Sequence, residues 1–397
     1  MNCPIYKKCG GCQLQNLTYE EQLSLKQSKI IKLVGKYCHV DEIIGMEHPY
    51  NYRNKISRAF GFRNGRIISG IYQSASRRIV QTDSCFLEDE YADKVIKTIR
   101  ELCISFRIKA YDINTGRGFF RHALIRRAKN SGETMAVLVT AKGDFPKKRD
   151  FVNALLQKHP ELTTVVWNIN PTETPLFLGE KSETLYGNGF ITETLLGNSF
   201  RISPRSFYQV NTKQTEVLYT KVLELAELSG KERVIDAYCG TGTIGLTLAR
   251  KAKSVIGVES NPDAVADAEA NARLNGIKNA QFVAADAGEF MQSLAEKGEK
   301  IDTVITDPPR AGCSKRFIES LLSLSPKKIV YVSCNPETLT RDLFALRKGG
   351  YKVKKIQPID MFPFTEHVET VVLLSREKAD DYIRISVHTK DLQTKEN

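Results

Sequence analysis

The chain has 397 residues, of which 41% are hydrophobic and 26% are charged. This balance excludes collagen-like and wholly disordered proteins and predicts two or three folded domains. No run of about 18 apolar residues occurs, so a membrane span is not expected. Lys and Arg outnumber Asp and Glu by 58 to 46, giving a net charge of +12. Such an excess favours a polyanionic partner such as RNA, although many basic enzymes bind no nucleic acid.

The first segment, residues 1–48, combines a cysteine cluster with one helix. Cys3, Cys9 and Cys12 are separated by five and two residues, which is a spacing typical of metal ligands. A fourth ligand would have to come from elsewhere in the chain. Four thiolates could hold zinc or an iron–sulfur cluster, and the spacing does not separate the two. Apolar positions between Leu17 and Val34 predict an amphipathic helix begun by a Thr or Asn cap.

No uninterrupted apolar run follows the start of the chain, so we expect a cytoplasmic protein whose nine cysteines are reduced. From residue 49 to 200 the pattern becomes short β-rich runs, such as 66–72 and 135–140. Helical stretches at 90–106 and 147–158 lie between such runs. This mixture predicts a compact α+β domain.

From residue 201 to 378 the pattern predicts a Rossmann-like α/β domain. Short apolar runs alternate with helices, which is typical of a doubly wound parallel sheet whose ligands bind at the carboxyl ends of its strands. We expect a polar tail at 379–397. The predicted strands are 234–236, 255–258, 281–284, 303–306 and 329–333, with a final strand at 369–374; the helices include 262–274, 317–324 and 336–348.

A glycine loop follows the first strand of this domain. Gly240, Gly242 and Gly245 follow Asp236, and Glu259 ends the second strand, where a carboxylate can accept the hydroxyls of a ribose. Both NAD and S-adenosylmethionine fit this logic, and a turn that only packs a helix on the sheet is a third interpretation. The Asp-x-x-x-Gly-x-Gly pattern favours S-adenosylmethionine. Asp286, after the third strand, could accept a hydrogen bond from an adenine amino group.

Two further strand ends carry groups suited to pyrimidine chemistry. Asp307 begins an Asp-Pro-Pro-Arg stretch, and Cys334 lies between a strand and the helix after it, where helix amides would lower its pKa. Carbon 5 of uracil cannot attack a methyl sulfonium until a thiolate has added to carbon 6. A base must then remove the carbon 5 proton, for which residues 365–369 offer Glu366 and Glu369. Cytosine methylation uses similar steps. A buried packing role is the alternative for Cys334.

Four motifs spread over the chain resemble the RNA uracil-5-methyltransferase family. They are Ser206-Phe207-Tyr208-Gln209-Val210-Asn211, Asp307-Pro308-Pro309-Arg310-Ala311-Gly312, Ser333-Cys334-Asn335-Pro336-Glu337, and Asp360-Met361-Phe362-Pro363 with His367-Val368-Glu369. The resemblance implies that Cys334 is the nucleophile and Glu369 the base, with Glu366 second. It also implies cofactor or substrate contacts for Gln209, Tyr238, Gly240, Gly242, Glu259, Asp286 and Asp307. Thr243 replaces an Asn found in many relatives. Phe207 is expected to pack in the core, as a lone Phe usually does, with packing against the cofactor or substrate ring as the alternative.

The resemblance extends to the cysteine cluster. It makes Cys85 the fourth ligand with Cys3, Cys9 and Cys12, and it favours a 4Fe-4S cluster over zinc, with a structural role. Radical methyltransferases use a different spacing, Cys-x3-Cys-x2-Cys. The other cysteines, Cys38, Cys103, Cys239 and Cys313, are expected to be packing residues.

The resemblance implies methylation of a uridine in 23S ribosomal RNA by a monomeric enzyme without an obligatory protein partner. Transfer RNA is the nearest alternative substrate, although relatives acting on it typically lack the cysteines; a radical methyltransferase and an inactive RNA-binding homologue are others. Several relatives begin with an RNA-binding barrel. Here the cysteine cluster comes first, so RNA contacts are expected from segments that mix cations with aromatics, at 52–58 and 117–122.

Overall fold

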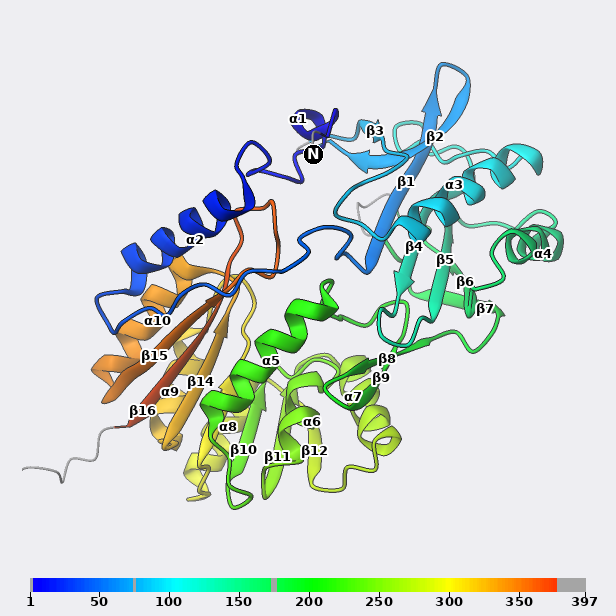
Figure 1. Cartoon of the computed structure of the whole chain (residues 1–397). Helices are drawn as coiled ribbons and strands as arrows, with labels where there is room; N and C mark the ends of the chain where they lie inside the picture. The colour runs from blue at the N-terminus through cyan, green and yellow to red at the C-terminus, as the bar shows by residue number, and fades with distance from the viewer. Residues whose placement is uncertain (1–2, 74–75, 173–176, 377–397) are drawn as a thin grey trace, which may run out of the picture.

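The computed structural model describes residues 3–73, 76–172 and 177–376, so the polar tail predicted at 379–397 lies outside the described residues. Within these ranges the chain forms two seven-stranded sheets and one two-stranded hairpin (Figure 1). None of the described helices is long and apolar enough to cross a membrane.

The first sheet belongs to the central part of the chain and has the order β3-β2-β1-β4-β5-β6-β7. Its strands are β1 (Lys55–Arg63), β2 (Arg66–Tyr72), β3 (Ile79–Gln81), β4 (Phe120–Arg127), β5 (Thr134–Thr140), β6 (Thr164–Ile169) and β7 (Lys181–Tyr186). Only the β5–β6 pair is parallel among the described neighbours. Helices α3 (Glu90–Ser105) and α4 (Lys148–Lys158) share one apolar core with a face of this sheet. The predicted strands and helices of this segment are confirmed.

The second sheet has the order β12-β11-β10-β13-β14-β16-β15. Its strands are β10 (Arg233–Ala237), β11 (Ser254–Glu259), β12 (Ala280–Ala284), β13 (Thr303–Thr306), β14 (Lys328–Ser333), β15 (Tyr351–Ile359) and β16 (Glu369–Arg376). β10 to β14 are parallel, as predicted, and the chain reverses its winding direction between β10 and β13. β16 is antiparallel and lies between β14 and β15.

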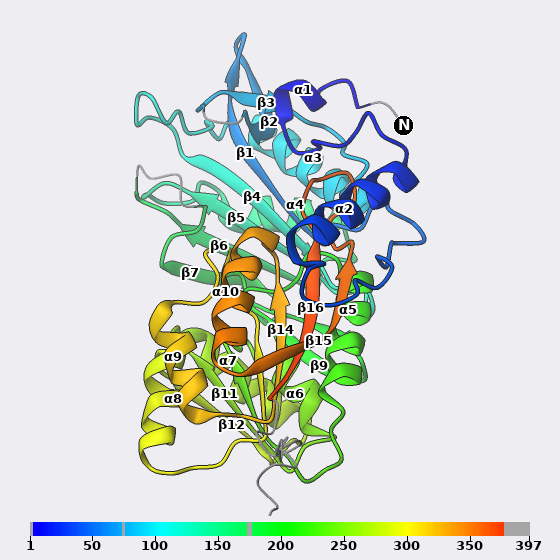
Figure 2. The same ribbon diagram turned by 90° about the vertical axis from the view of Figure 1, so that its left-hand side faces the viewer.

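The strands of the second sheet are connected by helices on both faces (Figure 2). They are α6 (Thr243–Ala249), α7 (Pro262–Leu274), α8 (Ala287–Glu296), α9 (Lys315–Leu324) and α10 (Pro336–Lys348), preceded by α5 (Thr212–Ala226). The hairpin β8 (Ile191–Leu195) and β9 (Asn198–Ile202) contributes apolar side chains to a core that also contains residues of α5, α6 and the central sheet.

The N-terminal segment contains α1 (Tyr6–Cys9) and α2 (Tyr19–Val34). A capping box formed by Thr18 and Glu21 begins α2, as its sequence predicted. The apolar face of α2 packs on the second sheet and on α10. The ammonium of Lys26, which is 1% exposed, lies 2.6 Å from a carboxylate oxygen of Asp360. Tyr19 donates to the other carboxylate oxygen at 2.9 Å, so α2 anchors the loop after β15.

We expect Lys26→Ala to lower the free energy of unfolding by about 3–5 kcal/mol, because it leaves the Asp360 charge buried without its partner. Urea denaturation followed by circular dichroism measures this loss. The matched control is Lys29→Ala in the same helix. Lys29 pairs with Glu337 at 3.0 Å on the surface, so its loss should cost about 0–1 kcal/mol. Equal losses for the two variants would contradict the stabilising role of the buried pair.

Candidate active site

Cys334 and Glu369 come from neighbouring strands of the second sheet. In the antiparallel pairing of β14 with β16, Ser333 lies opposite Thr370. Cys334 is the residue after Ser333, and Glu369 is the residue before Thr370. The same register therefore brings the thiol and the carboxyl to adjacent positions at one end of the sheet, although 34 residues lie between them in the sequence.

The loop that carries Cys334 is fixed by hydrogen bonds on both sides of it. The Ser333 hydroxyl accepts from the backbone N–H of Asn335 at 3.2 Å. The Asn335 side chain accepts from the N–H of Glu337, which caps α10, and donates to the carbonyl of Arg310 at 3.0 Å. The Cys334 loop is therefore attached directly to the Asp-Pro-Pro-Arg stretch that follows β13.

Burial changes the protonation of the carboxyls at this end of the sheet. It raises the pKa of Asp307 to about 7. Burial, and then the charge of Asp307, raise the pKa of Glu369 to about 8, while the Arg310 guanidinium opposes the shift. Glu369 is only 5% exposed. A carboxyl with a pKa near the working pH can both accept and return a proton, which suits a general base.

The raised pKa of Glu369 predicts how stability depends on pH. Between the ordinary value of 4.5 and about 8, the folded protein holds a proton that the unfolded chain releases. The contribution of protonated Glu369 to stability is therefore fully present below pH 4.5 and is lost as the pH rises to about 8. We expect Glu369→Gln to flatten this loss in thermal denaturation at a series of pH values. Glu366→Gln is the control and should leave the slope unchanged; equal slopes for Glu369→Gln and the parent protein would contradict the burial effect.

The pKa of Cys334 moves against the expectation from the sequence. The sequence predicted that helix amides would lower it. Instead, burial and the negative charges of Glu369 and Asp307 raise the pKa of this thiol to about 11, with Arg310 acting in the opposite direction. Burial is the largest of these effects. Arg310 is therefore the cation of the protein that favours the thiolate.

The glycine loop leaves open space at Gly240, which lines the same small cavity as Asp307. Gly240 has a φ of 53°, and a Cβ built on it would meet no atom within 4 Å. Gly242, with a φ of 80°, is packed so tightly that a Cβ would lie 3.0 Å from the Phe282 ring. Asp236 accepts from the N–H of Gly245 at 2.7 Å, which fixes the start of α6. A side chain at position 240 would thus fill an open space beside the loop.

The other predicted cofactor contacts line this space or its edge. Gln209, Tyr238, Gly240, Thr243 and Asp307 line one small cavity, and Gly240 and Glu259 line an adjoining one of about 620 Å³. Glu259 accepts from the N–H groups of Gly240 and Asn261. The Thr243 hydroxyl is 2.8 Å from that of Tyr219.

Asp286 and Phe207 lie differently from what their expected roles suggest. One oxygen of Asp286 caps α8 by accepting from the N–H of Glu289 at 2.9 Å. The expectation that Phe207 packs in the core is wrong, because Phe207 is 70% exposed and lines both cavities. The preceding residue, Ser206, is tied to α7, because its hydroxyl donates to Asp267 at 2.7 Å.

A separate cavity of about 300 Å³ opens on the Cys334 side. Lys29, Arg310, Cys334, Asn335, Glu366 and His367 are among its lining residues. Arg310 lies 3.2 Å from the His367 ring nitrogen, and burial, then the charge of Arg310, lower the pKa of His367. The sequence analysis assigned no role to Lys29 or His367; the His-x-Glu spacing was the only available signal for His367.

The donor set around the glycine loop fits S-adenosylmethionine. The open space at Gly240, the carboxylate of Glu259 and the exposed Phe207 ring supply close backbone approach, ribose acceptors and an apolar contact. Asp307 lines the small cavity beside the glycine loop, whereas Cys334 and Arg310 line a separate cavity. The site therefore offers one space for a methyl donor and another for a planar base.

Known proteins are similar to this chain in sequence and in fold. The tRNA (uracil-5-)-methyltransferase family model matches residues 185–377. An uncharacterized RNA methyltransferase of Halalkalibacterium halodurans is 45% identical over 94% of this chain and 82% of its own, and one of Listeria monocytogenes is 46% identical over 94% and 83%. The chain belongs to the RNA uracil-5-methyltransferase family. It is an S-adenosylmethionine-dependent methyltransferase, and the predicted Rossmann-like fold is confirmed.

A solved structure of this family covers almost the whole chain. The tRNA (uracil-54, C5)-methyltransferase of Pyrococcus abyssi, in complex with S-adenosyl-L-homocysteine, is 31% identical with a TM-score of 0.78. The match covers 94% of this chain and 87% of that one. The family resemblance therefore extends beyond the methyltransferase sheet to the central and N-terminal parts.

The N-terminal cysteines lie near one another without forming a metal site. Cys12 and Cys85 pack against the same small apolar cluster around Phe364. Burial, then the charges of Cys9 and Cys3, raise the pKa of Cys12 to about 11. Among the described residues, however, no three Cys, His, Asp or Glu side chains are arranged to hold a metal ion. The structure therefore does not bear out the expected iron–sulfur cluster.

Three of the basic residues in the expected RNA-contact segments 52–58 and 117–122 are buried, whereas Arg53, Lys55 and Arg117 are not. Arg58 is fully buried and forms ion pairs with Glu88 and Asp93, because its side chain points toward α3. Arg121 and His122 are also buried, at 3% and 4% exposure. Arg58, Arg121 and His122 therefore belong to the interior of the central domain and are not available to RNA, while contacts by Arg53, Lys55 and Arg117 stay a prediction.

Proposed function

We propose that this protein methylates carbon 5 of a uridine in 23S ribosomal RNA, with Cys334 as nucleophile and Glu369 as base. One observation carries the proposal. The register of β14 with β16 brings a thiol and a buried carboxyl to adjacent positions, and the thiol lines a cavity of about 300 Å³ that can take a planar base. Covalent methylation at carbon 5 needs the Cys334 thiol and the Glu369 carboxyl to reach the same uracil ring.

The reaction begins at Cys334. Its thiolate adds to carbon 6 of the uracil, forming a carbon–sulfur bond and moving an electron pair toward carbon 5 and the carbonyl oxygen at carbon 4. Arg310 favours the thiolate, because its charge opposes the burial that raises the thiol pKa. Asp307, whose pKa of about 7 leaves it partly protonated at neutral pH, can donate a hydrogen bond to the enolate oxygen.

Bound S-adenosylmethionine supplies the electrophilic methyl group that carbon 5 takes up. Gln209, Tyr238, Gly240, Gly242, Glu259 and Asp286 would hold the donor. Glu369, in its ionised form, then removes the proton from carbon 5. The released electron pair restores the carbon 5–carbon 6 double bond and expels the Cys334 thiolate. The enzyme returns to its starting state when Glu369 passes its proton to solvent. The target uridine has to leave its stack to reach the Cys334 cavity.

The domain division 1–48, 49–200 and 201–378 belongs to the same proposal, as does a cytoplasmic monomer. The family resemblance, rather than the arrangement of the described side chains, supports a 4Fe-4S cluster on four thiols, with zinc as the alternative. Cys3, Cys9, Cys12 and Cys85 would hold it, and its role would be structural. Iron and acid-labile sulfide analysis of protein purified without oxygen distinguishes the two metals.

Ribosomal RNA is supported over transfer RNA by the four-cysteine pattern, which the family resemblance associates with ribosomal RNA members. The test is to map 5-methyluridine in 23S ribosomal RNA and in transfer RNA from cells with and without this protein. We expect a loss at one or two 23S positions. If 5-methyluridine is lost only from transfer RNA, transfer RNA is the substrate instead. If it is lost from neither RNA, both substrate assignments are wrong.

A further inference from the structure

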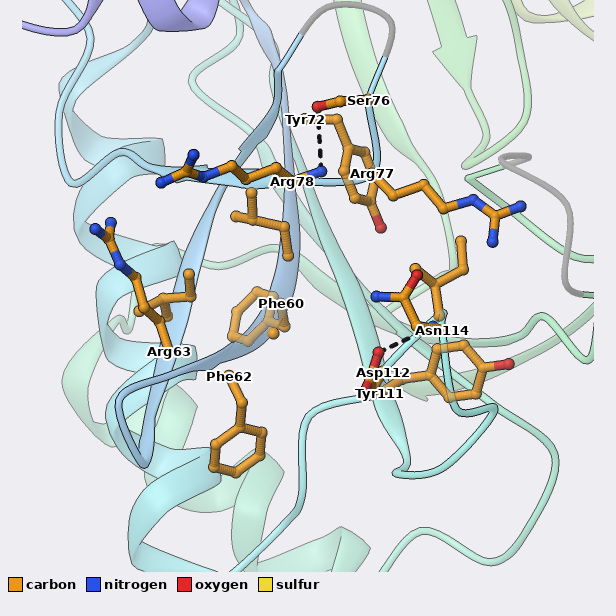
Figure 3. Close-up of a pocket in the computed structure, with 14 residues that line it drawn as sticks. Phe60, Phe62, Arg63, Tyr72, Ser76, Arg77, Arg78, Tyr111, Asp112 and Asn114 are labelled. Atoms are coloured by element: carbon orange, nitrogen blue, oxygen red, sulfur yellow. Dashed lines mark hydrogen bonds between the residues drawn. The ribbon is translucent and has the colours of Figure 1, made fainter.

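A second pocket lies on the central sheet, remote from Cys334 in the fold. It has a volume of about 630 Å³, within the range of about 300–1,000 Å³ typical of ligand sites. Its walls come from β1, β2, the segment that leads into β3, and the loop before β4 (Figure 3). Nothing in the proposed methyl transfer uses it.

Strand register shows which face of the sheet carries this pocket. Gly61 pairs with Ile68 and Tyr72 pairs with Ile79, so these pocket residues share one face of β1, β2 and β3. Ala59, on the same face, pairs with His122 of β4. The face opposite packs on α3. The pocket therefore opens on the side of the sheet that α3 leaves uncovered.

The same face continues toward the methyltransferase domain. Two positions along β4 from His122, Leu124 pairs with Val137 of β5. Both side chains belong to the apolar core shared with α5 and the β8–β9 hairpin. The pocket and the methyltransferase domain thus lie on one side of the central sheet, and a single RNA can follow this side from one to the other.

The charges of the pocket favour an anion. Arg63, Arg77 and Arg78 line it, are exposed, and form no ion pair within the described part of the chain. The one carboxylate in the lining, Asp112, is engaged by the N–H of Asn114 and the hydroxyl of Thr115. Three arginines against one occupied carboxylate leave a net positive charge in the pocket.

The apolar part of the pocket favours a flat ring. Tyr72 and Tyr111 line it from different segments, over a floor that includes Ile68 and Ile79. Aromatic side chains beside arginines are the usual surface for unpaired bases, because the rings stack on the base and the guanidinium groups bind the flanking phosphates. A regular duplex presents no exposed base face to such a pocket.

We propose that this pocket holds an unpaired nucleotide of the RNA substrate, at a distance from the uridine that is methylated. The inference rests on the proposed function and deepens it, since it adds a second contact point to the same RNA. The base would lie against Tyr72 and Tyr111, and its phosphates would contact Arg63, Arg77 and Arg78. The protein would then recognise two separated single-stranded positions in one folded RNA.

The test measures binding of the ribosomal RNA substrate at several salt concentrations. Arg77→Ala should weaken binding and lower the slope of log Kd against log salt by about 1, because one phosphate contact is lost. Arg149→Ala is the matched control, an exposed arginine of α4 on the covered side of the sheet. Tyr111→Leu should weaken binding about 5-fold or more without changing the slope, because stacking carries no net charge.

A structural readout separates this inference from the proposed function. The Glu369→Gln variant, with RNA containing photoreactive 4-thiouridine, should crosslink at peptides containing Tyr72 or Tyr111 while its Cys334 adduct is intact. If Arg77→Ala and Tyr111→Leu bind the RNA as tightly as the parent protein does, and the Cys334 adduct still forms, the pocket proposal is wrong and the proposed function stands. Failure of any adduct, with those two variants still weakened, would overturn the mechanism alone. If free uridine monophosphate binds the parent protein as tightly as the RNA does, and Arg77→Ala loses this binding, the pocket is a site for a free nucleotide instead.

Discussion

Cys334→Ala is expected to lower kcat for RNA methylation by about 10⁴-fold or more, as happens when a covalent nucleophile is removed. Without the thiolate, carbon 5 of uracil has too little electron density to attack a methyl sulfonium. Transfer of a radiolabelled methyl group to RNA measures the loss. Binding of RNA and of S-adenosylmethionine should remain, because the cavities on both sides keep their other lining residues.

Cys38→Ala is the control for this substitution. Cys38 is half-buried, like Cys334, but it lies outside the site, with its thiol near the carbonyl of His39. We expect its activity to match that of the parent protein. Full turnover by Cys334→Ala would contradict covalent catalysis and would return Cys334 to the role of a packing residue.

Glu369→Gln is expected to trap a covalent complex between the protein and methylated RNA, with turnover reduced by about 10²- to 10⁴-fold. The amide cannot take the carbon 5 proton, so the Cys334 thiolate cannot leave. A protein band of reduced mobility in denaturing gels, sensitive to ribonuclease, measures the trapped species. The same band should be absent from the double variant Glu369→Gln with Cys334→Ala.

Glu366→Gln distinguishes the two carboxylates of this segment. Glu366 lines the Cys334 cavity but is exposed, whereas Glu369 is buried beside Asp307. We expect Glu366→Gln to turn over without accumulating a covalent complex. Accumulation in this variant, together with normal product release by Glu369→Gln, would assign the base to Glu366.

The fold of the methyltransferase sheet was readable because its buried strands and its helices alternate clearly in the sequence. The placement of β15 and β16 was not. The β15 sequence contains three lysines and a proline, which hide its strand pattern, and no local signal reveals that β16 inserts between β14 and β15. Strand order depends on packing between segments far apart in the chain.

The candidate site residues could be predicted from motifs, but their electrostatics could not. The sequence places Cys334 at a helix start, which suggests a low thiol pKa. Burial and the negative charges of Glu369 and Asp307 raise this pKa instead. Asp307 follows β13 and Glu369 begins β16, so only the folded sheet brings them to the thiol. Burial caused a similar error for Arg58, whose neighbours Tyr52 and Arg53 made it resemble an RNA contact although it pairs with carboxyls beneath α3.

The insertion of β16 between β14 and β15 also has a consequence for biosynthesis. During translation, the strand that bears the base emerges after both of its future neighbours, so those neighbours cannot pair with each other in a lasting way. Cys334 is therefore synthesised before Glu369. A nascent chain that ends before β16 therefore contains Cys334 but lacks the carboxyl that the completed sheet sets beside it.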